Sequence, residues 1–145
     1  IGHPNFLCCS MAFCLLRPNH LILHSPKIPS GIERVGEGRP MEIWGDRQTR
    51  WPLIHRSDLA RAYCDLLDRP DLTGHFNVVS EEGVRVGDIL DAIAQAFGNT
   101  LPPVTLSADD LVSRHGAWAI GPTLDQQMSA AKLRSGTGWA RRFVS

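Results

Sequence analysis

Gly45-Asp46-Arg47-Gln48-Thr49-Arg50-Trp51-Pro52-Leu53-Ile54-His55-Arg56-Ser57-Asp58-Leu59-Ala60 is the stretch of sequence that decides the fold. Its first residues predict a turn, its apolar middle predicts a short buried strand over 51–55, and its polar end predicts the start of a helix. Ser57 or Asp58 is expected to cap that helix, because a side-chain oxygen there can accept a bond from a free backbone N–H. Arg69-Pro70 should close it. The stripe that should face the core recurs at helical spacing and comprises Leu59, Ala62, Tyr63, Leu66 and Leu67.

Short strands and helices alternate on either side of this stretch. Further strands are expected over 12–17, 41–44, 75–79 and 104–106. One more helix is expected over 88–97 with Phe97 buried and Gly98 at its end, and another from a Ser107–Asp110 capping box to 115–116. A last helix is expected over 126–134. This alternation is typical of an α/β fold.

The composition indicates a soluble globular domain. The chain has 145 residues, of which 43% are hydrophobic and 21% charged, which suffices for one core. Fifteen basic and fifteen acidic side chains balance, so no net field favours nucleic acid or a membrane surface. The four cysteines show no disulfide spacing and the apolar run 6–16 is about half the length of a membrane span, so we expect a cytoplasmic protein. Because the sequence opens on Ile1 rather than methionine, we expect a truncated start.

Several motifs occur in an order that resembles one enzyme family. They are Leu16-Arg17-Pro18, Arg50-Trp51-Pro52-Leu53-Ile54-His55-x-x-Asp58-Leu59-Ala60, Phe76-Asn77-Val78, and Ser129-x-x-Lys132-x-Arg134 followed by Gly138-Trp139. Together they resemble the C-terminal part of the extended short-chain dehydrogenases, the NAD-dependent epimerase/dehydratase type. The resemblance covers about residues 15–139. The agreement of several blocks in the correct order is more specific than any single motif.

The resemblance implies a fold and a division of the chain. It implies the C-terminal, substrate-binding portion of a Rossmann-like NAD(P)-binding α/β fold, with the nucleotide-binding half absent. Residues 1–145 would form a single unit, in which 1–24 are a remnant sheet strand with its connection and 25–145 are the substrate-binding portion. An apolar strand without its neighbours leaves an exposed sheet edge, so self-association is expected.

The resemblance also implies a function and a limit on it. The complete protein would use NAD or NADP to oxidise or reduce a sugar or another hydroxyl/keto substrate. This sequence contains neither a Gly-x-x-Gly-x-x-Gly loop nor a Tyr-x-x-x-Lys pair, since its only tyrosine, Tyr63, is followed by Leu67. We therefore expect no cofactor binding, no catalytic residue and no turnover in the chain alone. The alternatives are a non-catalytic module of the same family that binds a small molecule or a protein, and a gene fragment that folds poorly.

Arg50, Trp51 and Trp44 are the predicted substrate-binding residues. In nucleotide-sugar members of the family an arginine at the position of Arg50 contacts the substrate diphosphate, whose oxygens suit a planar guanidinium. The competing interpretation, given equal weight, is an exposed arginine at the start of a strand. Trp44 and Trp51 flank the turn and could form a ligand-facing wall, although packing against a helix is the more ordinary role.

His55, Asp58, Arg17 and Asn77 are predicted to form a structural motif. His55 and Asp58 could be a pair for proton transfer, but the structural interpretation is favoured, in which Asp58 caps the helix and His55 bonds backbone or that carboxylate. Arg17 would brace the same region. No metal site is expected, because His20 and His24 lie on a predicted strand without a completing ligand.

Overall fold

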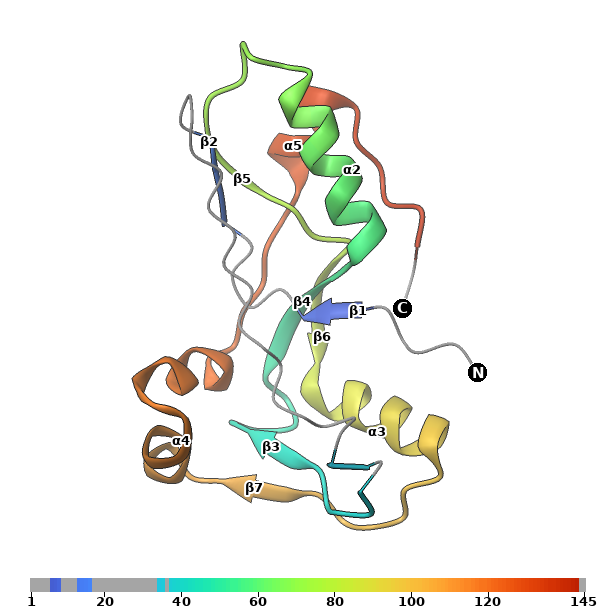
Figure 1. Ribbon diagram of the computed structural model, residues 1–145, viewed down its shortest axis with the longest axis vertical. Coiled ribbons are helices and arrows are strands. Elements are labelled where there is room, and N and C mark those ends of the chain that lie inside the picture. The colour runs from blue at the N-terminus through green and yellow to red at the C-terminus, as the bar shows by residue number, and fades with distance from the viewer. Residues whose placement is uncertain (1–5, 9–12, 17–33, 36, 144–145) are drawn as a thin grey trace. The chain divides into compact units, whose positions relative to one another are not determined.

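The computed structural model describes residues 6–8, 13–16, 34–35 and 37–143 (Figure 1). The chain divides into two units. Unit 1 comprises 1–26, 52–83 and 127–145, and unit 2 comprises 27–51 and 84–126. Two of the four points at which the chain changes unit lie within strands, β4 (Arg50–His55) and β6 (Glu81–Arg85). The boundary expected at 24/25 and the residue Arg17 lie outside the described residues, so both stay predictions.

Unit 1 packs two helices against short strands. β1 (Phe6–Cys8) pairs antiparallel with β4, and β2 (Phe13–Leu16) pairs antiparallel with β5 (Gly74–Asn77). Helices α2 (Arg56–Leu67) and α5 (Ala131–Thr137) contact each other, and α5 also contacts β5. The core that these elements enclose consists of Ile54, Ala62, Leu66, Phe76, Val78, Val79, Ala130, Leu133 and Trp139.

Helix α2 follows its predicted course but not its predicted cap. His55 is the N-cap residue, and its Nδ1 accepts a hydrogen bond from the N–H of Ser57 at 3.2 Å. The prediction that Ser57 or Asp58 caps the helix is therefore wrong. The buried stripe is confirmed at Ala62 and Leu66, but Leu67 is 66% exposed because it lies about 100° around the helix from Leu66.

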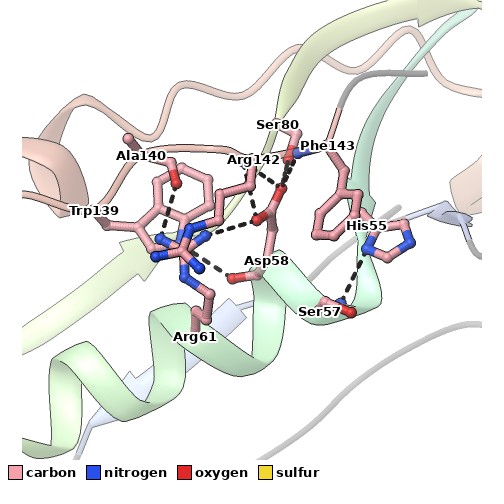
Figure 2. A network of polar contacts seen from close by, with 9 residues as sticks. All are labelled: His55, Ser57, Asp58, Arg61, Ser80, Trp139, Ala140, Arg142 and Phe143. Atoms are coloured by element: carbon pink, nitrogen blue, oxygen red, sulfur yellow. Dashed lines mark hydrogen bonds and ion pairs between the residues drawn. The ribbon is translucent and has the colours of Figure 1, made fainter.

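Asp58 lies in the first turn of α2 and has no solvent exposure. Its carboxylate accepts hydrogen bonds from the backbone N–H groups of Arg142 and Phe143 at 3.1 Å, and from the Arg61 guanidinium at 3.0 Å. The hydroxyl of Ser80 donates to it at 3.5 Å. Figure 2 shows these donors converging on one side chain from three separate parts of the chain.

The C-terminal segment, residues 139–143, is attached to the start of α2 by further contacts. The indole N–H of Trp139 donates to the carbonyl oxygen of Asp58 at 3.1 Å, and Arg61 donates to the carbonyl of Ala140 at 3.2 Å. The Phe143 ring stacks on the His55 ring with 4.1 Å between centroids (Figure 2). Asp58 and His55 together therefore fix the C-terminal segment to the strand-to-helix junction.

Unit 2 contains a two-stranded parallel pair with helices before and after its second strand. β3 (Glu42–Trp44) pairs in parallel with β7 (Val104–Leu106), with Ile43 opposite Thr105. Helix α3 (Val86–Phe97) precedes β7, and α4 (Ala108–His115) follows it (Figure 1). A 3-10 helix, η1 (Ala117–Thr123), packs against α4.

Most predicted elements are confirmed, and the differences have local causes. The Ser107 hydroxyl accepts from the Asp110 N–H at 3.1 Å, and Gly98 ends α3 in the left-handed region with φ 65°. Phe97 is 40% exposed rather than buried. The last helix begins at Ala131 instead of 126, because the N–H groups of Gln126 and Met128 donate to the carbonyls of Arg50 and Glu82 on the two strands. Strand β6 and helix η1 were not predicted.

Asp58→Ala tests whether this carboxylate holds the C-terminal segment. The substitution leaves the N–H groups of Arg142 and Phe143 without their charged acceptor, and a hydrogen bond to a charged group contributes about 1.5–3 kcal/mol. We expect the free energy of unfolding, measured by urea denaturation, to fall by about 3 kcal/mol. Amide hydrogen exchange over 139–143 should also become faster.

Asp65→Ala, on the same helix, is the matched control and should change stability by less than about 0.5 kcal/mol. A loss of only about 1 kcal/mol in Asp58→Ala, the value of a helix cap, with unchanged exchange over 139–143, would contradict the role assigned to Asp58.

Candidate functional site

An open, polar depression of about 520 Å³ lies in unit 2. It is formed where four parts of the chain meet: the turn before β4, the start of β4, the end of β6, and the end of η1 with the residues after it. Two arginines and two aspartates contribute charge, and an amide and two hydroxyl groups contribute hydrogen-bonding capacity. Its lining residues are Asp46, Gln48, Thr49, Arg50, Arg85, Thr123 and Asp125.

The turn before β4 is held against the wall of this depression. The N–H of Asp46 donates to the Thr49 hydroxyl at 3.2 Å, and the N–H of Thr49 donates back to the Asp46 carbonyl at 3.1 Å. Gly45 precedes them with φ 90°, and a Cβ there would lie 2.9 Å from the carbonyl oxygen of Thr123. Only glycine therefore allows the turn to lie this close to the last residue of η1.

Arg50 is bound to Asp125 through one edge of its guanidinium and through its backbone N–H. Its Nε donates to Asp125 at 3.0 Å, its NH2 group at 2.5 Å, and its backbone N–H at 2.8 Å. These bonds lower the pKa of Asp125 to about 2 and raise the pKa of Arg50 above its ordinary value. Both side chains stay partly exposed, at 40% and 49%. The pair therefore presents a fixed cation and a fixed, ionised acceptor to the depression.

Arg85 is the second cation of the depression. It is the last residue of β6, and its Nε donates to the carboxylate of Asp88 at 2.9 Å. The next residue, Val86, donates its N–H to the carbonyl of Thr49 at 2.8 Å, which joins the end of β6 to the start of β4. Arg85 and Asp125 were both missed by the sequence analysis, because neither belongs to a motif and each is brought to the site by pairing between distant segments.

Of the three predicted substrate-binding residues, Arg50 lines the depression and the two tryptophans do not. Trp51 is buried, and its indole N–H donates to the carbonyl of Pro122 at 2.7 Å, which fixes η1 beside β4. Trp44 is 2% exposed and packs 4.8 Å from the ring of His115 and 5.8 Å from that of Trp118. The structure thus gives both tryptophans packing contacts, and their binding role stays a prediction.

The other predicted residues lie in unit 1. His55 and Asp58 form the junction with the C-terminal segment described above. Asn77 is the last residue of β5, where it is opposite Phe13 of β2. The described residues contain no group of three or more His, Cys, Asp or Glu side chains that could hold a metal ion. None of the described helices has both the length and the apolar character needed to cross a membrane.

The described helix starts do not fit a dinucleotide. A glycine-rich turn holds pyrophosphate by letting it approach backbone N–H groups at a helix N-terminus. Among the described helices, α3 alone has a glycine in its first turn, Gly87, and a Cβ there would lie 3.1 Å from both Nε and the carbonyl oxygen of Arg47. The space that this glycine leaves is therefore filled by the chain itself.

Three solved structures have a similar fold, and each contains UDP or a UDP-sugar. One is UDP-glucose 4-epimerase with UDP-glucose from the hyperthermophilic eubacterium Thermotoga maritima, at 17% identity and TM-score 0.61, covering 83% of this chain and 35% of that one. A second is the Bordetella bronchiseptica enzyme WbmG with NAD and UDP, at 22% identity and TM-score 0.57, covering 81% and 34%. A third is a mutant UDP-glucuronic acid 4-epimerase from Bacillus cereus with a fluorinated UDP-sugar and NAD, at 14% identity and TM-score 0.61, covering 84% and 37%.

Sequence comparison agrees with the fold. An uncharacterised protein of Schizosaccharomyces pombe is 22% identical over 95 residues, which are 66% of this chain and 32% of that protein. The chain spans about a third of the length of the relatives that it matches. The α/β fold class expected from the resemblance is confirmed. The family model described as "NAD dependent epimerase/dehydratase family" matches residues 7–79, half of the 145 residues, so the chain belongs to that family.

Proposed function

We propose that this chain supplies the substrate-binding portion of an NAD(P)-dependent epimerase/dehydratase-like oxidoreductase, and that its polar depression binds the diphosphate and sugar of a nucleotide sugar. The observation that carries the proposal is the Arg50–Asp125 pair on the wall of the depression. The ligands of the similar structures, UDP-glucose and UDP, support this substrate class.

The Arg50–Asp125 pair suits the two chemical parts of such a substrate. A guanidinium has five N–H donors in a planar fork, so one arginine can serve a carboxylate and a phosphate at the same time. An ionised carboxylate accepts hydrogen bonds from hydroxyl groups, which sugars supply. Because Asp125 holds Arg50 through three bonds, less side-chain entropy is lost when the substrate binds.

The chain's own contribution would be to bind and orient the substrate. In the complete protein the nicotinamide cofactor would accept and return the hydride at a hydroxyl or keto carbon. The described helix starts form no glycine-rich cradle for that cofactor. The cytoplasmic location and the self-association of an exposed sheet edge stay predictions.

Arg50→Gln tests the proposed site. Glutamine keeps polarity and approximate length but removes the charge and the fork. We expect the affinity of the 145-residue chain for UDP-glucose, measured by isothermal titration calorimetry, to fall about 10- to 100-fold, as it does when a charge-assisted bond to phosphate is lost.

Arg47→Gln is the matched control. Arg47 is another exposed arginine of the same turn, bound to Asp91 at 2.6 Å, and it does not line the depression. Its removal should change the affinity less than about two-fold, since its guanidinium is bound to Asp91 and is not part of the lining, so only a screened charge is lost. An equal loss in both variants would show a general charge effect, and it would rule out a phosphate contact at Arg50.

The lowered pKa of Asp125 predicts a pH dependence of stability. Its pKa is about 2 in the fold against an ordinary value of 3.8. A carboxylate with a lowered pKa stabilises the fold when ionised, so its contribution is complete above about pH 4 and is lost as the pH falls through about 2. The Tm of wild type should therefore exceed that of Asp125→Asn at neutral pH, and the difference should shrink over this window. The difference is expected to be small, because the pair is partly exposed.

Arg50→Gln should reproduce the same pH dependence, and the double variant should add nothing, since both substitutions remove one interaction. A Tm difference that stays constant from about pH 7 to pH 2 would contradict the ion pair as its cause.

The isolated chain is not expected to bind NAD or NADP appreciably, because its described helix starts provide no open glycine turn for pyrophosphate. Calorimetric titration with each dinucleotide checks this. Affinity in the micromolar range would contradict the assignment of the chain to substrate binding alone.

A further inference from the structure

Arg50 and Arg85 lie across from each other on neighbouring strands. β4 and β6 are adjacent in one sheet. They run antiparallel, since Ser80 donates to Leu53 while the later residue Val86 donates to the earlier residue Thr49. Arg50 follows Thr49 and Arg85 precedes Val86, so the two arginines are opposite neighbours beside this bond. Residues opposite each other in an antiparallel pair point to the same face, and both of these side chains line the depression.

Two like charges in opposite positions destabilise a sheet, and here each arginine has its own counter-ion. The two counter-ions are held very differently. Asp125 takes the Nε, an NH2 group and the backbone N–H of Arg50. Asp88 takes only the Nε of Arg85, with both side chains more than half exposed.

Of the two arginines, Arg85 therefore loses less interaction energy than Arg50 when it leaves its aspartate for another anion. An exposed ion pair with a single hydrogen bond contributes little stability. The terminal NH1 and NH2 groups of Arg85 make no hydrogen bond to any residue in the part of the chain that the structure describes. These groups can bind an anion in the depression while Asp125 keeps Arg50 in place.

We propose that Arg85 is a specificity-determining residue, which with Arg50 binds the two adjacent phosphoryl groups of a diphosphate and so selects diphosphate over monophosphate substrates. The proposal rests on the function proposed above for the depression. Because both guanidinium groups line one depression, each can bind one phosphoryl group of a diphosphate, whereas a monophosphate offers only one such group. Asp88 acts as a competitor that holds Arg85 when no anion is bound.

Calorimetric titration with UDP and with UMP tests the proposal, because the two probes differ by one phosphoryl group. Wild type should bind UDP more tightly than UMP. Arg85→Gln should weaken UDP binding about ten-fold and change UMP binding less than about two-fold, which removes the selectivity. Arg85→Lys keeps the charge and loses the planar fork, so its affinity for UDP should lie between those of wild type and Arg85→Gln. The Arg47→Gln control should keep the wild-type selectivity, and matching thermal melts should show that each variant is folded.

Asp88→Asn provides a second, opposite readout. If Asp88 competes for Arg85, its neutralisation should tighten UDP binding two- to five-fold, which is the size expected for one exposed ion pair. This gain in affinity should vanish in the Arg85→Gln background. A gain that persists without Arg85 would mean simple repulsion and would overturn the competition.

The outcomes separate the two proposals. If wild type binds UDP and Arg50→Gln weakens it, but Arg85→Gln keeps the preference for UDP over UMP, the role of Arg85 is wrong and the proposed site stands. If wild type binds neither probe nor UDP-glucose, the proposed function itself fails.

Discussion

The carboxylate of Asp58 is the interaction on which unit 1 depends. An ionisable group with no solvent exposure is costly to bury unless its acceptor positions are filled. Its donors come from the backbone of Arg142 and Phe143, 84 and 85 residues away, and from Ser80, 22 residues away. Burial of Asp58 therefore requires that the start of α2, the chain after β5 and the C-terminal segment meet at one point, and the core beneath them is closed by the same contacts.

Asp125 differs from Asp58 in that it is only partly buried. Asp125 also joins distant segments, 75 residues from Arg50, but half of its side chain stays in solvent. Exposure makes the pair a weak contributor to stability and leaves both groups accessible to a ligand. The chain thus uses one carboxylate, fully enclosed, to hold unit 1 together and another, half-open, to orient a cation in unit 2. Burial, rather than residue type, distinguishes the structural role from the binding role.

Elements with local causes could be predicted from the sequence, and elements with distant partners could not. The Ser107–Asp110 cap and the end of α3 at Gly98 depend on residues within four positions, and both were predicted. Strand β6 was missed because its alternation is weak and its pairing with β4 supplies the order. Arg50 was found through the family motif. Its partner Asp125 and its neighbour Arg85 reach the depression only through strand pairing and the turn after η1.

Charge balance in the depression determines how it can recognise an anion. The chain carries equal numbers of basic and acidic residues, and each arginine of the depression has its own aspartate. No long-range field therefore attracts an anion, in contrast to proteins with a basic patch. Binding must instead proceed as an exchange, in which phosphate oxygens replace or share a carboxylate on a guanidinium that is already positioned. Such an exchange favours ligands whose oxygens match the fork over ligands that merely carry charge. Binding should accordingly depend on the geometry of the anion more than on ionic strength.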